Sequence, residues 1–141
     1  MITRVPDARP LLLSPAAPDS ASGGASSGRL DAKRCQRRTG SAFSASGLTR
    51  PGSFALTHGS EAVRTYRPGD GGWNKSYCSN CGSHVFTRHP ENQELLGLRL
   101  RTLDQDPGVR PRAHQFVDYA APWAPIPDDG LPHFPERMSW E

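Results

Sequence analysis

The stretch Trp73-Asn-Lys-Ser-Tyr-Cys-Ser-Asn-Cys-Gly-Ser-His-Val-Phe-Thr87 decides the fold that we expect for this chain of 141 residues. Residues 73–77 and 85–87 each predict a strand, because aromatic and β-branched residues favour the extended conformation. Cys78-Ser-Asn-Cys81-Gly82 lies between them, and Gly82 supplies a position where the backbone can turn with positive φ. The stretch therefore predicts a hairpin whose turn carries a C-x-x-C motif.

Cys78 and Cys81 have the spacing of a zinc-ligand pair, because two thiolates two residues apart can share one tetrahedral Zn²⁺. A complete site needs further ligands, so the motif alone also allows a redox pair or two inert thiols. No strand–helix–strand pattern of the thioredoxin type surrounds the pair. We therefore favour zinc ligation in a C-x-x-C knuckle.

Alternation of apolar and polar residues predicts further strands on both sides of this hairpin. The clearest lies in residues 96–101, where three leucines alternate with Gly97, Arg99 and Arg101. A short helix is expected from Cys35 to a stop at Gly40. The fold class is therefore mainly β, with other strands expected around Phe43 and Leu48, Phe54 and Leu56, Val63 and Thr65, and in residues 114–118.

Composition predicts a small β-rich domain with a distinct N-terminal part. Only 35% of the residues are apolar, and 14 Gly and 14 Pro favour turns over the interiors of helices and strands. Residues 20–28 contain only Ser, Ala and Gly, which cannot bury enough apolar surface to offset their ordering entropy. We expect a disordered or aberrant segment over residues 1–34, one zinc-binding β domain over residues 35–135 and a tail over residues 136–141.

Basic residues exceed acidic ones modestly, with a formal net charge of +3. Their one dense cluster could contact a phosphate or a carboxylate substrate, or it could form a solvated basic turn. No aromatic ladder interleaves with this cluster, so nucleic acid is not an expected partner. No run of about 18 apolar residues occurs, and we expect a cytoplasmic protein without a membrane partner. The cluster consists of Lys33, Arg34, Arg37 and Arg38.

Cys35 is the remaining cysteine, and an odd count of three favours metal or redox chemistry over a disulfide framework. The basic residues beside Cys35 favour the thiolate form of its side chain. Taken alone, Cys35 can be a reactive thiol, a metal ligand or an inert buried residue.

Several segments together resemble the glutathione-dependent formaldehyde-activating family, which includes the centromere-protein-V-like proteins. Each segment alone is weakly specific, but their order and spacing match the family over residues 35–135. The segments are Cys35-Gln-Arg-Arg-Thr-Gly-Ser-Ala-Phe, Tyr77-Cys-Ser-Asn-Cys-Gly-Ser, Arg101-Thr-Leu-Asp-Gln-Asp-Pro, Ala113-His-Gln-Phe-Val-Asp-Tyr-Ala-Ala-Pro-Trp and Asp129-Gly-Leu-Pro-His-Phe-Pro.

The resemblance implies a zinc-bearing, mainly antiparallel β fold of the kind described as a β-tent. It implies a structural zinc, held by an N-terminal C-x-C pair and a later C-x-x-C pair, and a catalytic zinc held by a C-x-C-x-x-C motif. The implied activity is that of a carbon–sulfur lyase, typified by the condensation of formaldehyde with glutathione. Cys78 and Cys81 match half of the structural site, and Cys35 matches the last cysteine of the catalytic motif.

The chain departs from the family pattern where the other ligands should lie. Leu30 and Ala32 occupy the positions of the other two catalytic cysteines, and residues 1–28 contain no cysteine. Two thiolates provide half of a closed tetrahedral shell, and Cys35 alone cannot hold zinc against water. We therefore assign no residue as catalytic, whereas Arg37 and Arg38 are candidates for binding a glutathione carboxylate.

Two functions follow from these observations. By family, the chain is a carbon–sulfur lyase that acts through zinc on glutathione-type thiol adducts of small aldehydes and is impaired by its missing ligands. By its own residues, it is a non-catalytic, zinc-binding scaffold remnant of that family. A nucleic-acid-binding module is the third-ranked alternative. The abrupt change near residues 29–35 fits a shifted reading frame, a wrong start or genuine divergence, which the other two reading frames of the nucleotide sequence would distinguish.

Overall fold

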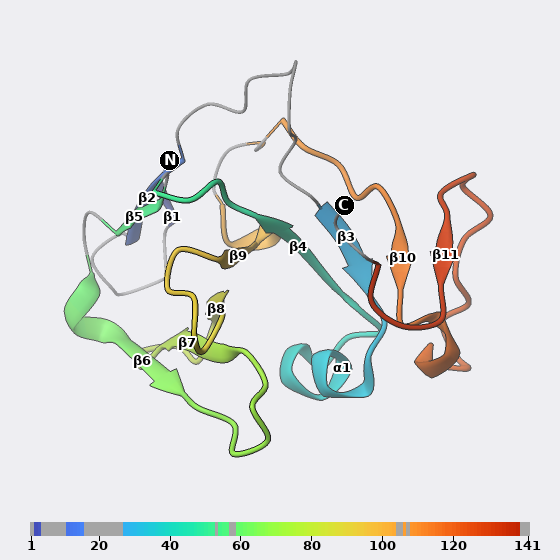
Figure 1. Cartoon of the computed structure of the whole chain (residues 1–141), viewed down its shortest axis with the longest axis horizontal. Helices are drawn as coiled ribbons and strands as arrows, with labels where there is room; N and C mark the ends of the chain where they lie inside the picture. Colours follow the sequence, from blue (N-terminus) through green and yellow to red (C-terminus); the bar gives the residue numbers. More distant parts are fainter. Residues whose placement is uncertain are drawn as a thin grey trace.

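The computed structural model describes residues 2–3, 11–15, 27–52, 54–56, 59–103, 106 and 108–138. Strands dominate these ranges, and the one α-helix in them, α1 (Lys33–Thr39), is short (Figure 1). The expectation of a mainly β fold is confirmed. The strands are β1 (Ile2–Thr3), β2 (Leu11–Pro15), β3 (Ser27–Leu30), β4 (Ser44–Leu48), β5 (Phe54–Leu56), β6 (Val63–Tyr66), β7 (Asn74–Cys78), β8 (His84–Arg88), β9 (Leu96–Arg99), β10 (His114–Gln115) and β11 (His133–Phe134).

An eight-stranded sheet forms the body of the described structure, in the order β11-β10-β3-β4-β9-β8-β7-β6. The neighbours from β3 to β6 are antiparallel, whereas β10 pairs in parallel with both β3 and β11. A smaller sheet has the order β1-β2-β5. In Figure 1, β6 and β7 lie on one side of α1, and β10 and β11 lie on the other.

The predicted hairpin is formed by β7 and β8, with the C-x-x-C segment as its turn. The Cys78 N–H donates to the Ser83 carbonyl at 2.9 Å, and the Gly82 N–H donates to the Cys78 carbonyl at 2.7 Å. Gly82 has a φ of 74°, which an L side chain rarely adopts. Backbone hydrogen bonds and glycine therefore close this turn.

The residues of β9 divide the central sheet into two faces. Leu96 and Leu98 lie in a buried apolar cluster, because alternate residues of a strand point to the same face. Phe86 of β8 is the register partner of Leu98 and belongs to the same cluster. Phe54 of β5 packs against this cluster from the smaller sheet, with its ring centroid 5.1 Å from that of Phe86. The opposite face of the sheet carries Gly97 and Arg99 and lies outside this apolar cluster.

Regular secondary structure occurs within residues 1–34, which composition set apart as disordered or aberrant. Residues 27–30 form β3 in the interior of the main sheet, and α1 begins at Lys33, although we expected disorder or aberrant chain through residue 34. The sequence Ser-Gly-Arg-Leu carries no strand pattern of its own. Its backbone is held from both sides, because β3 pairs with β4 and the Arg29 N–H donates to the Ala113 carbonyl at 3.0 Å. The earlier residues 4–10 and 16–26 lie outside the described ranges.

Helix α1 ends where the sequence predicted it to end. Gly40 has a left-handed φ of 62°, and its N–H donates to the Gln36 carbonyl at 2.9 Å, which satisfies an end carbonyl of the helix. The helix begins two residues before Cys35, so Cys35 lies in its first turn. None of the described helices combines the length and the apolarity that a membrane crossing requires.

A buried ion pair lies at the end of β3. Arg29 Nη2 donates to Asp31 Oδ1 at 2.9 Å, and both side chains are buried. The Arg29 guanidinium also covers the Phe43 ring, with its carbon atom 4.1 Å from the ring centroid. The Asp31 N–H donates to the Gln115 carbonyl at 3.0 Å, so β10 and the ion pair hold the same point of the chain.

We expect the Asp31→Asn variant to lose roughly 3 kcal/mol of unfolding free energy, because it leaves Arg29 as a buried charge without its partner. Asp106→Asn is the matched control, since Asp106 forms an exposed pair with Arg110. Urea denaturation followed by circular dichroism measures both variants. Equal small effects at the two positions would contradict a structural role for the buried pair.

Candidate functional site: a basic cavity beside Cys35

A cavity of about 530 Å³ opens on the polar face of the main sheet. Its floor includes Lys75, Thr87, Gly97 and Arg99, which come from three adjacent strands. The register accounts for this, because Lys75 pairs with Thr87 and Thr87 pairs with Gly97. Arg99 follows two residues after Gly97 and therefore lies on the same face. The polar positions of the alternating strands thus form the bottom of a cavity.

The wall of the cavity is formed where β3 passes into α1. Leu30, Ala32 and Cys35 all line it, together with Arg34 and Arg38 of the helix. The backbone fixes this wall, because the Cys35 N–H donates to the Ala32 carbonyl at 2.8 Å at the start of α1. The positions that match the three cysteines of the family's catalytic motif therefore face one cavity in this chain, and one of them carries sulfur.

Two cations on the floor are largely excluded from water. Lys75 is 9% exposed and Arg99 is 7% exposed. Burial, together with the charges of Arg38 and Arg99, lowers the pKa of Lys75 to about 8. Burial also lowers the pKa of Arg99. A Cys35 thiolate acts in the opposite direction on the pKa of both groups, so its sulfur lies within electrostatic reach of both cations.

Arg99 is held by neutral acceptors among the described residues. Its guanidinium donates to Ser44 Oγ at 2.9 Å and to Ser46 Oγ, and its Nε donates to His84 Nδ1 at 3.3 Å. Burial lowers the pKa of His84 to about 3, with added effects of Arg99, Arg38 and Lys75, so the imidazole is neutral at pH 7. These contacts fix the orientation of Arg99 and leave its positive charge without a described counter-ion.

The C-terminal part of the chain lines the remaining side of the cavity with Phe116, Tyr119, Glu136 and Arg137. Phe116 adopts a φ of 60°, which is unusual for a residue with a side chain. Its N–H donates to the Glu136 carbonyl at 3.2 Å, and the Tyr119 hydroxyl donates to Glu136 Oε1 at 2.8 Å. The Arg137 guanidinium lies 5.4 Å from the centroid of the Trp73 ring. Glu136 is thus the acidic residue in a mostly basic lining.

The structure separates the residues that the sequence proposed for the site. Cys35 and Arg38 line the cavity, whereas Arg37 is exposed and is not part of the lining. Cys78 is buried in the apolar cluster and Cys81 is exposed at the β7–β8 turn, so neither lines the cavity. All three cysteines are free thiols. Their roles as ligands and that of Arg38 as a substrate-binding residue stay predictions.

The cysteines do not provide a complete zinc site within the described part of the chain. Cys81 Sγ lies 3.1 Å from Ser83 Oγ at the exposed turn. None of the three cysteines belongs to a group of three or more His, Cys, Asp and Glu side chains with metal-ligand spacing among the described residues. The three residue positions of the family's catalytic motif offer one sulfur and two hydrocarbon side chains. These residues do not fit the catalytic zinc that the family pattern implies.

Sequence reasoning missed the cations that matter most for the cavity. Lys75 lies within the strand expected over residues 73–77, and Arg99 is a polar position of the alternating strand over residues 96–101. Nothing in these patterns distinguishes a face exposed to solvent from a face that lines a cavity. Arg137 falls in what we expected to be a tail, yet it lines the cavity and stacks on Trp73. The sequence signal that could have indicated the cavity is the presence of lysine and arginine at the polar positions of adjacent predicted strands.

The fold and the cavity together define a β-sheet protein with a basic cavity of about the size of a small molecule. Comparison with known proteins makes this specific: the sequence pattern of the glutathione-dependent formaldehyde-activating enzyme family matches residues 31–119, which is more than half of the chain. The chain belongs to this family, as its sequence predicted. No curated protein matches the chain significantly.

The fold is also similar to that of a solved structure. The crystal structure of a Rhodobacter sphaeroides protein superposes with a TM-score of 0.52 at 21% sequence identity, and the match covers 86% of this chain and 89% of the other. At this level of identity the comparison supports the fold alone.

We expect the Lys75→Met variant to be more stable than the unmodified chain at pH 7, by roughly 1–3 kcal/mol, because Met removes a buried charge. The pKa of Lys75 is about 8 in the fold and 10.5 ordinarily. Between these values the unfolded chain binds more protons, so the free energy of unfolding of the unmodified chain rises with pH across this range. The advantage of Met should therefore shrink between pH 7 and pH 10.

Urea denaturation at the two pH values measures this difference. Lys33→Met is the matched control, since Lys33 is exposed and its replacement should change stability little at either pH. An equal gain for Lys75→Met at pH 7 and pH 10 would show that the effect comes from packing and not from the charge.

Proposed function

We propose that the cavity binds an anionic thiol, or a thiol adduct of a small aldehyde, of the glutathione type. By this proposal the chain is a cytoplasmic member of a carbon–sulfur lyase family whose zinc-dependent chemistry is impaired. One observation carries the proposal: Leu30, Ala32 and Cys35 line the same cavity as the buried cations Lys75 and Arg99. The cationic residues that would bind the ligand are present, whereas two of the three positions that match the family's catalytic cysteines carry hydrocarbon side chains.

The charges around the cavity favour a ligand with carboxylates. Six cationic side chains come from four separate parts of the chain, whereas Glu136 is the acidic residue of the lining. Arg38 Nη1 is buried and has no hydrogen-bond partner among the described residues, so it is a donor available to a ligand. Carboxylates accept hydrogen bonds from guanidinium groups in pairs, which gives both affinity and orientation. The six are Lys33, Arg34, Arg38, Lys75, Arg99 and Arg137.

The same wall explains why the zinc chemistry should be impaired. A catalytic zinc needs three protein ligands and one open position, where it would polarise a carbonyl-level carbon and activate a thiol. Leu30 and Ala32 offer no donor atom, so Cys35 would have to hold the ion almost alone. A scaffold remnant that binds zinc weakly through Cys78 and Cys81 is the second candidate, and the C-x-x-C spacing at the β7–β8 turn favours it.

Arg38→Gln is expected to weaken the binding of glutathione about tenfold or more, because a buried charge-assisted hydrogen bond is lost. Isothermal titration calorimetry with glutathione at low salt measures the affinity. Arg37→Gln is the matched control from the next position of the same helix, and it should bind as the unmodified chain does. Equal weakening by both substitutions would indicate a general effect of net charge. Failure of the unmodified chain to bind glutathione would refute the proposal.

Restoring the missing sulfurs tests the zinc part separately. The double variant Leu30→Cys/Ala32→Cys should bind one additional zinc per chain and accelerate the formation of the glutathione–formaldehyde adduct relative to the unmodified chain. Leu30→Ser/Ala32→Ser is the control, since it changes polarity at both positions without adding thiolates. Metal analysis and NMR detection of the adduct give the two readouts. If the cysteine variant bound no additional zinc, the assignment of this wall as the former metal site would be wrong.

A further inference from the structure

A second group of chemically active side chains lies where β10 and β11 meet. His114 and His133 are register partners in these parallel strands, so their side chains lie on the same face of the sheet. The two rings meet edge to face, with centroids 4.9 Å apart. Asp129 belongs to the loop before β11, and its two carboxylate oxygens lie 3.0 and 3.1 Å from His114 Nε2.

These three side chains have the spacing of a set of metal ligands. One ligand atom from each lies within 4.8 Å of those of the other two, and no other group of three or more His, Cys, Asp and Glu among the described residues meets this condition. The ligand atoms around a tetrahedral zinc ion lie roughly 3–4 Å from one another, because each is about 2 Å from the ion. The separations between His114 Nε2 and the Asp129 oxygens already fall at the short end of this range.

The group combines a fixed ligand with two accessible ones. His114 is 2% exposed, and its Nδ1 atom has no hydrogen-bond partner among the described residues, so Asp129 is the described polar partner of the ring. The Leu131 N–H donates to Asp129 Oδ1 at 3.1 Å, and Gly130 turns the loop with a φ of 77°. Asp129 and His133 are exposed, so an ion can reach them from solvent.

We propose that His114, Asp129 and His133 bind a divalent transition-metal ion such as zinc, with one coordination position open to solvent. Two neutral imidazoles and one carboxylate suit zinc and its neighbours, whereas magnesium and calcium prefer oxygen ligands alone. The ion replaces the hydrogen bond between His114 and Asp129 and joins β10, β11 and their connecting loop. This site uses none of the three cysteines and does not depend on the function proposed for the cavity.

Cobalt(II) is the probe for this site, because its visible spectrum distinguishes nitrogen and oxygen ligands from thiolates. The full chain, freed of metal by dialysis against a chelator, is titrated with cobalt and then with zinc. We expect one cobalt ion per chain, a spectrum without a thiolate charge-transfer band, and displacement of cobalt by zinc. The absence of saturable cobalt binding would overturn the proposal.

Variants assign the ligands. His133→Asn and Asp129→Asn should each weaken cobalt binding by about tenfold or more, and the asparagine at position 129 keeps the capacity to hydrogen-bond His114. Cys81→Ser should bind cobalt as the unmodified chain does. Binding that is lost in Cys81→Ser, or unchanged in both His133→Asn and Asp129→Asn, would show that the ion lies elsewhere. Circular dichroism confirms that each variant is folded before titration.

Discussion

The cavity of this protein depends on two cations that are held out of water on one face of a sheet. Lys75 and Arg99 lie on β7 and β9, and their register through β8 places them on the same surface. A buried charge is unfavourable unless a counter-ion or several hydrogen bonds compensate for it. Arg99 is compensated by serine hydroxyls and a neutral histidine, while the lowered pKa of Lys75 reflects incomplete compensation. An anionic ligand in the cavity would supply the counter-charge that the described residues do not provide for these two cations.

Apolar packing on the opposite face of the sheet stabilises the strand that carries the buried Arg99. Leu96 and Leu98 place the other face of β9 in the apolar cluster, so the strand that carries Arg99 is fixed by packing. The alternating pattern of this strand was readable from the sequence, and its polar face was not. A leucine at every second position indicates that one face of the strand is buried. The environment of the opposite face depends on α1 and the C-terminal segment, which are distant in sequence. Strands were therefore predictable and the cavity was not.

Strand β3 could not be predicted from its own residues, because its structure also depends on distant parts of the chain. Its residues have low intrinsic preference for a strand, yet it lies between β4 and β10, and the Asp31 N–H is bound by the Gln115 carbonyl. A Cβ atom at Gly28 would lie 2.6 Å from Gln115 Nε2, so the buried Gln115 side chain would have to shift to admit a larger residue there. Tertiary pairing thus overrides local propensity. The cavity wall at Leu30 and Ala32 follows from this strand, which composition alone did not predict.

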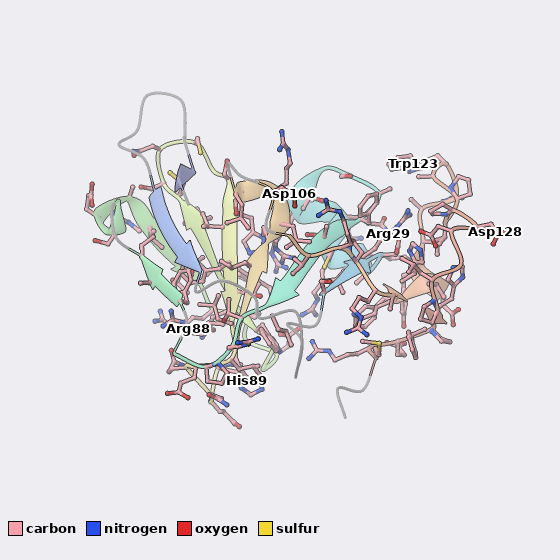
Figure 2. The ribbon with its side chains drawn as sticks, turned by 90° about the horizontal axis from the view of Figure 1, so that it is seen from above. Arg29, Arg88, His89, Asp106, Trp123 and Asp128 are labelled. Atoms are coloured by element: carbon pink, nitrogen blue, oxygen red, sulfur yellow. The ribbon has the colours of Figure 1, made fainter. Side chains whose placement is uncertain are left out.

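The described fold has several sources of cohesion other than thiolate ligation. In small metal-binding domains, binding free energy is folding free energy, so the loss of ligands should weaken the fold. Here Cys78 is fully buried beside Val85 and Phe86, where it acts as a small apolar residue, and backbone hydrogen bonds close the turn that it begins. The buried pair of Arg29, labelled in Figure 2, and Asp31 stabilises the end of β3 without sulfur. Sheet pairing and packing therefore hold the cavity wall at Leu30 and Ala32, two positions that offer no metal ligand.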